Sequence, residues 1–594
     1  MARLDDEAED TVESLPLPPA TSAQGMGTTL SELQKADPSL VECHMSYDLA
    51  LSKEEIEDAA TGYYYNDQIL SFRTVIMRWN VSCTRQLLEK RQGFGGNKCV
   101  DKFNLGKYIY QSYQEVNELV IKFGIGLNYY FNFNNKNNNN NDNKVNQQQS
   151  IAIYAETQKE WLIAALGCFR QLAIVVSLPT NLPPKTIINS LLETEIRIII
   201  TSFGPLLAKL QKEILPTCPQ IDYVIILDDH INKIGPTVSP YKTSDNFNTI
   251  SYYSLIFAGK ENEDICKDNI KYIDESVVEF IMYTCGTIDE PKGVKLTHGN
   301  IFSEVSAFCI RADYRQLGNL YLAYLPLAYV TELIIELSCI AMHITIAYSS
   351  PSTLNNKSPQ ILEGCHGDFI EAQPTCVFFV SSMLKYIMNG ITKNNYSIWD
   401  HIAFEKKFKL KWIANVWDKY ISRKICEQFF GNRLMTVIIG GDLISKESYQ
   451  KLRTLFNCSV IIGYGTTETT ACITSSNKSD DVLHCGDPNY RVKLSLIDWI
   501  GGDFKTTDKP HPRGEVVVSG PIVAREYSRI TGKGDDGGDF FLSKRGIWSF
   551  KTGDIGEINC ESGMLRIIDR KINFQRLKNG EYNCAHSKIE LDDY

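Results

Sequence analysis

Apolar runs of strand length alternate with helical patterns through much of this 594-residue chain. Runs such as 150–154, 197–201 and 435–439 are short and rich in Ile, which is typical of buried strands. Segments with apolar residues at helical spacing, for example 159–168 and 205–214, lie between such runs. Strands joined by helices form parallel β–α units, in which helices cover both faces of a sheet. The pattern therefore predicts an α/β fold with a large N-terminal domain of parallel β–α units.

Two later apolar runs predict a different kind of structure toward the end of the chain. Residues 514–519 and 563–569 have the pattern of strands, and they favour a β-rich subdomain after the β–α units. The whole chain is 43% hydrophobic and 22% charged, which is ordinary for a globular protein. Its length is sufficient for more than one domain.

Two stretches lack the apolar residues that a core requires. Residues 1–40 are polar and poor in aromatic side chains, so we expect a disordered acidic tail. Residues 132–149 are almost entirely Asn, Gln and Lys, which predicts a solvated insertion that lengthens one loop. We therefore expect the tail, a large domain over 41–568 that contains the insertion, and a short remainder over 569–594.

The charge and the cysteines exclude several classes of function. The net charge of −10 argues against nucleic acid as a partner, because phosphate backbones are bound through basic clusters. Seventeen cysteines include no Cys-x-x-Cys pair, so we expect a reducing compartment and neither a disulfide framework nor a zinc site. The apolar region 320–348 contains Pro326, Glu332 and Glu336, and is predicted to be core rather than a membrane span. We expect a cytoplasmic protein, with peripheral contact to a membrane such as the endoplasmic reticulum left open.

The stretch at 283–294 carries the most informative local chemistry. It follows an apolar strand pattern and contains hydroxyl side chains, two glycines and a lysine. Glycines let backbone N–H groups approach an anion, hydroxyl groups donate hydrogen bonds, and the lysine adds a positive charge. The stretch therefore predicts a phosphate-binding loop, although a turn that binds nothing has a similar local composition. The candidate residues of this loop are Thr284, Gly286, Thr287, Lys292 and Gly293.

Three later segments, 463–469, 550–554 and 567–571, follow this loop along the chain. In this order, the loop and the three segments resemble the signature motifs of the adenylate-forming superfamily, which includes acyl-CoA synthetases, luciferases and peptide-synthetase adenylation domains. The string Gly-Tyr-Gly-x-Thr-Glu in the first of them is specific. Residues 151–161 and 374–390 resemble the long-chain fatty-acyl-CoA synthetases most closely.

The resemblance implies an AMP-binding domain over 41–568, followed by a hinge at Asp569 and the start of a truncated C-terminal domain. It implies ATP, Mg²⁺ and coenzyme A as cofactors and a long-chain fatty acid as substrate. The acid would be joined to the α-phosphate of ATP with release of pyrophosphate. The acyl-adenylate would then pass its acyl group to coenzyme A.

The resemblance also assigns roles to particular residues. Thr467, Glu468 and Lys292 would be catalytic, and Glu468 and Thr284 would hold Mg²⁺. Asp554 would accept hydrogen bonds from the ribose hydroxyls, since a carboxylate offers two acceptor oxygens. The full set implied to bind the nucleotide is Thr284, Gly286, Thr287, Gly293, Gly440, Gly441, Tyr464, Gly465, Asp554 and Arg570.

Three residues of the loop depart from the family pattern. Cys285, Ile288 and Asp289 stand where Ser, Thr and Gly are usual. Ile288 removes a hydroxyl donor, and Asp289 adds a negative charge near the expected phosphates. The sequence ends shortly after the expected hinge, at Tyr594, without the lysine that the family carries in its C-terminal domain. Two alternatives therefore stand beside the ligase: a catalytically impaired relative that binds nucleotide or fatty acid, and an adenylate-forming enzyme for another carboxylic acid.

Overall fold

The computed structural model describes most of the chain from residue 105 to residue 576, together with three short strands. The described residues are 41–43, 75–80, 105–131, 149–227, 247–262, 274–284, 291–311, 317–356, 358–362, 364–394, 423–424, 426–445, 448–449, 452–453, 458–476, 484–502, 504–528, 539–543, 546–576 and 582–584. The predicted tail and all but the last residue of the predicted insertion lie outside these residues. Gly286 and Thr287 of the phosphate-binding loop also lie outside them.

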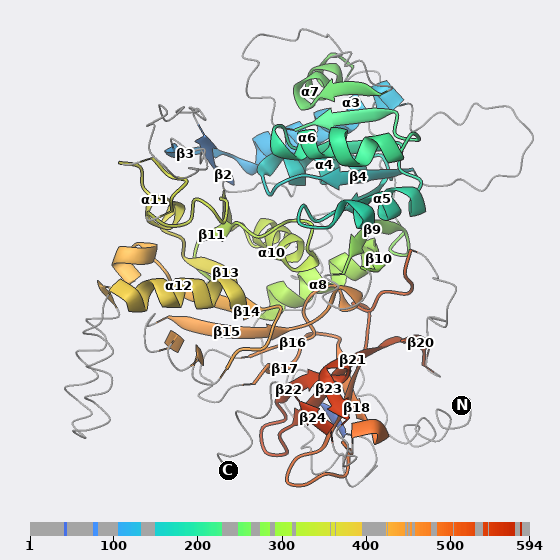
Figure 1. The fold of residues 1–594 in the computed structure, drawn as a ribbon, viewed down its shortest axis with the longest axis vertical. Helices are drawn as coiled ribbons and strands as arrows, with labels where there is room; N and C mark the ends of the chain where they lie inside the picture. Colours follow the sequence, from blue (N-terminus) through green and yellow to red (C-terminus); the bar gives the residue numbers. More distant parts are fainter. Residues whose placement is uncertain are drawn as a thin grey trace, which may run out of the picture.

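The first sheet of the fold has seven strands, in the order β10-β9-β5-β4-β6-β7-β8 (Figure 1). Only β10 runs antiparallel to its neighbour, so the predicted parallel arrangement is confirmed. The strands are β4 (Ser150–Tyr154), β5 (Ile174–Ser177), β6 (Ile198–Thr201), β7 (Tyr223–Ile226), β8 (Asn248–Ser251), β9 (Val278–Tyr283) and β10 (Gly293–Thr297). The helices are α3 (Tyr113–Phe131), α4 (Lys159–Phe169), α5 (Pro184–Glu193), α6 (Pro205–Lys209), which continues as a π-helical turn over Leu210–Ile214, and α7 (Tyr252–Glu261).

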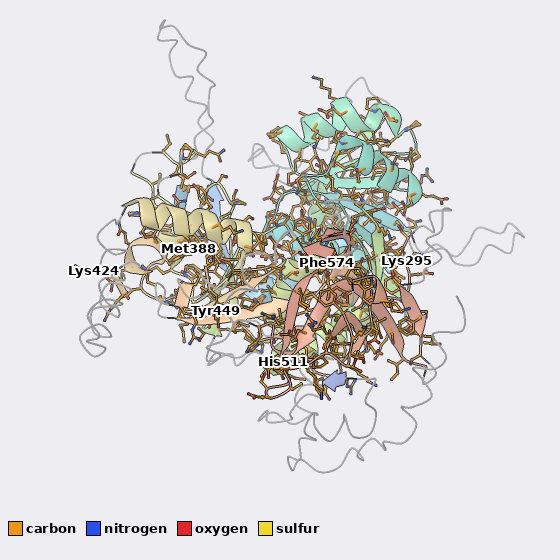
Figure 2. The ribbon with its side chains drawn as sticks, turned by 60° about the horizontal axis from the view of Figure 1, so that its bottom comes forward. Lys295, Met388, Lys424, Tyr449, His511 and Phe574 are labelled. Atoms are coloured by element: carbon orange, nitrogen blue, oxygen red, sulfur yellow. The ribbon has the colours of Figure 1, made fainter. Side chains whose placement is uncertain are left out.

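A second sheet has nine strands in the order β17-β16-β15-β14-β13-β11-β12-β2-β3. Its strands from β15 to β2 are parallel, and the strands at both edges are antiparallel. The strands are β2 (Val75–Asn80), β3 (Leu105–Gln111), β11 (Leu320–Ala323), β12 (Thr345–Tyr348), β13 (Cys376–Val380), β14 (Thr436–Gly440), β15 (Ser459–Tyr464), β16 (Thr474–Ser475) and β17 (Asp487–Pro488). The helices are α8 (His298–Arg311), α10 (Val330–Ala341), α11 (Asp368–Ala372) and α12 (Ser381–Asn394). Met388 of α12 and Tyr449, both labelled in Figure 2, belong to the apolar cluster that covers one side of this sheet.

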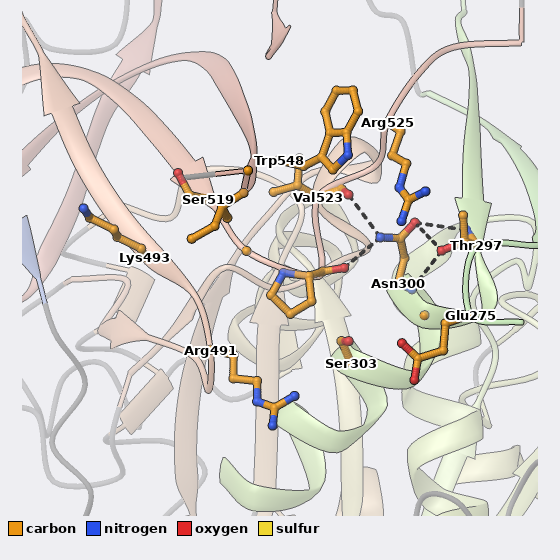
Figure 3. A pocket seen from close by; sticks show the side chains of 15 residues that line it. Glu275, Thr297, Asn300, Ser303, Arg491, Lys493, Ser519, Val523, Arg525 and Trp548 are labelled. Atoms are coloured by element: carbon orange, nitrogen blue, oxygen red, sulfur yellow. Dashed lines mark hydrogen bonds between the residues drawn. The ribbon is translucent and has the colours of Figure 1, made fainter. Parts of the chain in front are cut away.

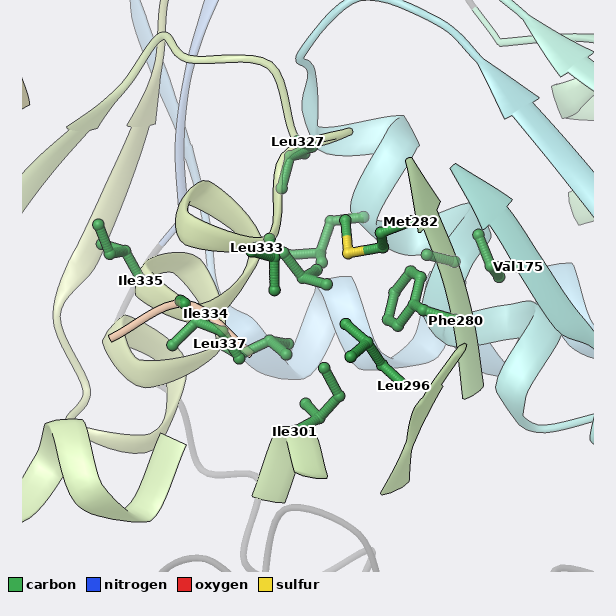
Figure 4. Packing of buried hydrophobic residues seen from close by; sticks show 14 of the residues in the cluster. Val175, Phe280, Met282, Leu296, Ile301, Leu327, Leu333, Ile334, Ile335 and Leu337 are labelled. Carbon is green, nitrogen blue, oxygen red and sulfur yellow. The ribbon is translucent and has the colours of Figure 1, made fainter. Parts of the chain in front are cut away.

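The two sheets share one hydrophobic core, which α8 and α10 help to fill. Figure 4 shows Leu333 and Leu337 of α10 facing Phe280 and Met282 of β9, all of them buried. Burying one such side chain contributes roughly 2 kcal/mol to folding. The region 320–348 thus folds as β11, α10 and β12, as predicted for a core segment. Within the described part of the chain, no helix combines the length and the apolar character needed to cross a bilayer.

A third sheet is antiparallel and lies at one end of the molecule (Figure 1). Its order is β1-β18-β19-β21-β20, with β22 paired to β21, and it confirms the predicted β-rich subdomain. The strands are β1 (Val41–Cys43), β18 (Lys493–Ile497), β19 (Arg513–Ser519), β20 (Phe540–Leu542), β21 (Trp548–Ile558) and β22 (Leu565–Arg570). A small hairpin of β23 (Phe574–Arg576) and β24 (Tyr582–Cys584) follows.

Candidate active site

The turn after β15 brings two of the predicted site residues, Tyr464 and Glu468, close together in the chain. A Cβ atom on Gly465 would lie 1.5 Å from the Ala471 carbonyl oxygen, so only glycine fits this turn. Thr466 caps the short 3₁₀ helix that follows (Thr467–Thr469), because its N–H donates to Thr469 Oγ1 at 3.1 Å. The backbone that carries Glu468 is therefore fixed by local hydrogen bonds.

A cluster of contacts joins Tyr464 to Asp554 and Arg570, which come from a later part of the sequence. The Tyr464 hydroxyl donates to Asp554 Oδ2 at 2.7 Å, and Arg570 Nε lies 3.5 Å from Asp554 Oδ1. Asp554 and Arg570 are direct partners in the antiparallel pairing of β21 with β22. Gly553 takes a φ of +72°, a conformation that glycine adopts without strain, just before the aspartate.

The buried carboxyl of Asp554 has an unusual acidity. Burial raises its pKa to about 6, and the Tyr464 hydrogen bond and the Arg570 charge oppose this rise. The negative charges of Glu468 and Asp569 raise the pKa further, which means that both carboxyls lie close enough to act on Asp554. The carboxyl therefore titrates near pH 6, well above the usual range of an aspartate.

Tyr527 connects the phosphate-binding loop to Glu468. Its hydroxyl donates to Glu468 Oε1 at 3.1 Å, and the Lys292 ammonium lies 5.1 Å from the centre of its ring. Burial raises the pKa of Glu468, while the Tyr527 hydrogen bond and the Lys292 charge act against it. Sequence analysis missed Tyr527, because residues 525–528 have no regular pattern that would mark them as part of a site.

The segment that carries Tyr527 is held against β10. Ser528 donates its N–H to the Gly293 carbonyl at 2.6 Å, and Tyr527 forms an isolated bridge with Val294. A Cβ atom on Gly293 would lie 2.6 Å from Ser528 Oγ, so the two segments approach closely. This pairing brings a residue of the β-rich part of the chain to the base of the phosphate-binding loop.

The base of that loop is closed by Thr284 and Lys292. The Thr284 N–H donates to the Lys292 carbonyl, and the Lys292 N–H donates to Thr284 Oγ1, both at 3.0 Å. The Thr284 hydroxyl keeps its own proton for donation to a ligand. The structure thus holds the two described ends of the predicted loop in register.

The remaining predicted residues lie on neighbouring strand ends. Gly440 ends β14, and a Cβ atom on it would be 3.3 Å from the Gly463 carbonyl, so it borders the turn that begins at Tyr464. Gly441 follows at a φ of +84°. Thr467 is half-buried, and its carbonyl accepts the Thr470 N–H at 3.1 Å. The expected hinge residue Asp569 accepts hydrogen bonds from the Arg570 N–H at 2.7 Å and from Asn573 Nδ2 at 2.6 Å.

The assembled side chains combine cations with hard oxygen donors. Lys292 and Arg570 can neutralise an anion, and the Thr284 hydroxyl and Glu468 carboxylate are ligand types that suit Mg²⁺. Among the described residues, no group of three or more His, Cys, Asp and Glu side chains could enclose a metal ion. The Thr284 hydroxyl and the Glu468 carboxylate are donors that suit a magnesium ion, which usually keeps waters and takes further oxygens from phosphates.

Comparisons with known proteins agree with this geometry. Residues 97–528 match the model of the AMP-binding enzyme family. Long chain acyl-CoA synthetase 8 of Arabidopsis thaliana is 30% identical over 534 residues, which cover 85% of this chain and 69% of the relative. Long-chain-fatty-acid–CoA ligase 2 of Schizosaccharomyces pombe is 29% identical over 514 residues, which cover 82% of this chain and 68% of the relative.

Two solved structures share the fold. The A domain of the carboxylic acid reductase from Segniliparus rugosus, solved with AMP and a co-purified carboxylic acid, has a TM-score of 0.65 at 17% identity, over 90% of this chain and 76% of that one. A long-chain-fatty-acid-CoA ligase from Archaeoglobus fulgidus has a TM-score of 0.58 at 15% identity, over 88% of this chain and 85% of that one. The match to the family model over residues 97–528 and the 30% identity to an acyl-CoA synthetase lead to one conclusion: this chain belongs to the AMP-binding enzyme family, in the branch of the long-chain acyl-CoA synthetases.

Proposed function

We propose that this chain activates a long-chain fatty acid with ATP, first to the acyl-adenylate and then to acyl-CoA. The names of its relatives support the substrate class. The observation that carries the proposal is two sets of contacts between segments far apart in the chain. In the first, Tyr527 contacts both Lys292 and Glu468. In the second, Asp554 contacts both Tyr464 and Arg570. Segments that resemble four motifs of one reaction are thus neighbours in space.

Each residue would act on one part of the nucleotide. The Asp554 carboxylate would accept hydrogen bonds from the ribose hydroxyls, with Arg570 donating beside it. The Tyr464 ring would pack against the adenine, next to Gly440 and Gly441. Lys292 and Thr284 would donate to the phosphates, together with Gly286, Thr287 and the backbone of the loop. When bound, Mg²⁺ would neutralise phosphate charge, with Glu468 and Thr284 as its protein ligands.

The reaction itself requires little from the protein beyond orientation and charge. A carboxylate oxygen of the fatty acid attacks the α-phosphorus, and the bond to the leaving pyrophosphate breaks without proton transfer. The thiolate of coenzyme A then attacks the acyl carbon and releases AMP. Holding the two anions together against their repulsion is the main task, and Lys292 and the donors of the loop would reduce that repulsion.

The extent of the domain and the location of the protein belong to the same proposal. An adenylation domain over 41–568 is supported by the pairing of β1 with β18, which ties residues 41–43 to the β-rich subdomain. A hinge at Asp569 is supported by its place at the end of β22. We place the activity in the cytoplasm, with contact to a membrane surface such as the endoplasmic reticulum, where long-chain fatty acids are concentrated.

Two residues of the phosphate-binding loop favour a second candidate function. Asp289 adds a negative charge to the expected phosphate-binding loop, and Ile288 lacks a hydroxyl donor. Both changes would weaken phosphate binding in the transition state. The second candidate is therefore a relative that binds nucleotide or fatty acid without turnover.

Fatty-acid-dependent exchange of labelled pyrophosphate into ATP separates the candidates. Exchange with palmitate that disappears in Glu468→Ala supports the proposed ligase, and formation of palmitoyl-CoA completes the test. Binding of AMP without exchange supports the second candidate. Exchange with other carboxylic acids but not with palmitate shows an adenylate-forming enzyme of different specificity.

A further inference from the structure

Two polar side chains of α8 hold the backbone of other segments. Asn300 Nδ2 donates to the Pro521 carbonyl at 2.7 Å and to the Val523 carbonyl at 3.0 Å, as Figure 3 shows. Glu304 Oε1 accepts the Cys472 N–H at 3.0 Å. Residues four apart in a helix are neighbours on its surface, so Asn300 and Glu304 lie on one face of α8. This face therefore fixes the backbone at two places.

Glu304 is a rare kind of residue for the interior of a protein. Its side chain is fully buried, and burial raises the pKa of its carboxyl well above the usual range, although the Cys472 hydrogen bond opposes the rise. Among the described residues, none forms a hydrogen bond with its second oxygen, Oε2, which is also buried. A buried polar atom without a partner costs stability. Core stability alone therefore does not account for this carboxyl, and its one hydrogen bond does.

That hydrogen bond lies at the end of a turn with a strained backbone. Thr470 and Ala471 take φ angles of +55° and +104°, in a region that residues other than glycine rarely adopt. Such conformations persist only where the surrounding contacts hold them. The next residue, Cys472, is held at both polar groups of its backbone. Its N–H donates to Glu304, and its carbonyl accepts from Asn489 Nδ2 at 3.0 Å.

The same turn carries two of the predicted nucleotide-binding side chains, Tyr464 and Glu468. The Ile473 N–H donates to the Tyr464 carbonyl at 2.7 Å, so the end of the turn is bonded to its start. A Cβ atom on Gly465 would lie 2.9 Å from Cys472 Cα, which shows how closely the two ends pack. A shift of Cys472 would therefore move the backbone that carries both side chains.

The segment that Asn300 holds reaches this turn as well. Thr470 Oγ1 donates to the Ile522 carbonyl at 2.6 Å, and the Ala524 N–H donates to the Glu468 carbonyl at 2.8 Å. Helix α8 thus restrains the turn directly through its contact with Cys472 and indirectly through residues 521–524. The direct contact depends on one side chain, so it can be tested by itself.

We propose that Glu304 is a positioning residue of the nucleotide site, because it holds the Cys472 N–H and thereby the turn over residues 464–472. The role requires an acceptor oxygen at the reach of a glutamate side chain, and it does not require a charge. Its effect on nucleotide binding rests on the proposed function, whereas the restraint of the turn does not.

Three substitutions at Glu304 separate reach from acidity. Glu304→Gln keeps an acceptor oxygen at the same reach without an acid. Glu304→Asp keeps the acid but withdraws the acceptor by one methylene group. Glu304→Met has a similar length and no strong acceptor. Glu336→Met is the matched control, since it removes an equally buried carboxyl that accepts one hydrogen bond, from the Tyr348 hydroxyl.

Hydrogen exchange followed by mass spectrometry measures the restraint without a ligand. Peptides that cover residues 464–473 should exchange about fivefold faster in Glu304→Met than in the wild type, the effect of one lost hydrogen bond. They should exchange faster in Glu304→Asp than in Glu304→Gln. The control Glu336→Met should change their exchange less than about twofold, because independent sites do not couple.

Wild-type exchange in Glu304→Met overturns the proposal. Faster exchange in Glu304→Gln than in Glu304→Asp also overturns it, because acidity rather than reach would then matter. The comparison of these two milder variants decides the question if Glu304→Met does not fold.

Calorimetric titration with AMP, well below the Tm of every variant, measures the consequence for the site. Affinity should fall about fivefold in Glu304→Met and less than about twofold in Glu304→Gln and Glu336→Met. A lower Tm in Glu304→Met with unchanged AMP affinity overturns the positioning role. Absence of AMP binding in the wild type instead overturns the proposed function, and hydrogen exchange still decides whether Glu304 holds the turn.

Discussion

Asp554 is the residue whose chemistry is most clearly set by its surroundings. Its neighbours Tyr464 and Arg570 favour the charged form, while burial disfavours it, and the balance puts its pKa at about 6. A carboxylate that accepts two ribose hydroxyls must be ionised. Nucleoside binding is therefore expected to depend on pH in the range where this carboxyl titrates.

Adenosine is the appropriate probe for this dependence, because it has no phosphate that titrates in the same range. Its affinity should fall by about tenfold for each pH unit below about 6, as the ionised fraction of Asp554 falls. Calorimetric titrations from pH 5 to pH 8 measure the effect. Asp554→Asn should bind adenosine weakly and with a flat pH profile, and a wild-type profile that is equally flat would contradict the assigned role.

Tyr527 supplies a second prediction at the scale of single residues. Tyr527→Phe keeps the ring beside Lys292 but loses the hydrogen bond to Glu468, which should cost about 1 kcal/mol in ATP binding or turnover. Tyr527→Leu loses both contacts and should cost more. Values of kcat and KM for ATP measure both variants, with Tyr253→Phe on the exposed side of α7 as a control. Equal activity of the Phe and Leu variants would show that the Lys292 contact is unimportant.

At the scale of elements, α10 carries a pair of carboxyls inside the core. Glu332 and Glu336 are both fully buried and lie one helical turn apart. The Tyr321 hydroxyl donates a hydrogen bond to Glu332, and the Tyr348 hydroxyl donates one to Glu336, both at 2.7 Å. Burial raises the pKa of both groups, that of Glu336 to about 8. The folded state therefore favours the protonated form of both carboxyls.

This arrangement predicts how stability depends on pH. Unfolded, Glu336 releases its proton near pH 4.5, whereas the folded protein retains it to about 8. The folded state binds more protons between these values, so the free energy of unfolding falls as pH rises through this window. Glu336→Gln, which is uncharged and still accepts from Tyr348, should make the fall in Tm from pH 5 to pH 9 shallower. Superimposable curves for the variant and the wild type would exclude a contribution from this group.

At the scale of the whole molecule, α8 and the segment 521–524 connect the two larger sheets to the β-rich subdomain. Asn300 of α8 donates to two carbonyls of the segment 521–524, that of Pro521 and that of Val523. The candidate active site depends on this junction, because Lys292 comes from the first sheet, Glu468 from the turn after a strand of the second, and Asp554 from the third. Loosening the junction should therefore affect stability and nucleotide binding together.

Asn300→Ala tests this dependence. The change leaves a buried carbonyl of Val523 without its donor and should cost about 1–3 kcal/mol of stability. AMP affinity should fall as well, because the same segment holds the Glu468 backbone. Thermal unfolding and calorimetric titration measure the two effects, and Ser303→Ala, one turn along α8, is the matched control. A loss of stability with unchanged AMP affinity would separate the junction from the site.

Much of the architecture follows from local sequence. Apolar runs predicted β4, β6 and β14 within about one residue of their bounds, because periodicity reflects which face of an element is buried. The resemblance of four segments to known motifs, together with their order, pointed to the family. The helix predicted at 205–214 continues as a π-helical turn in its second half, a detail of hydrogen bonding that residue periodicity does not encode.

What the tertiary structure alone decided is which distant residues touch. The pairing of Asp554 with Arg570 depends on the register of β21 and β22, and the contact of Tyr527 with Lys292 and Glu468 depends on a segment with no periodic pattern. The raised pKa of the two carboxyls on α10 also depends on packing, because burial is its main cause. Local propensities set the elements of this protein, whereas strand register and packing, which sum interactions over the whole chain, set the chemistry of its site.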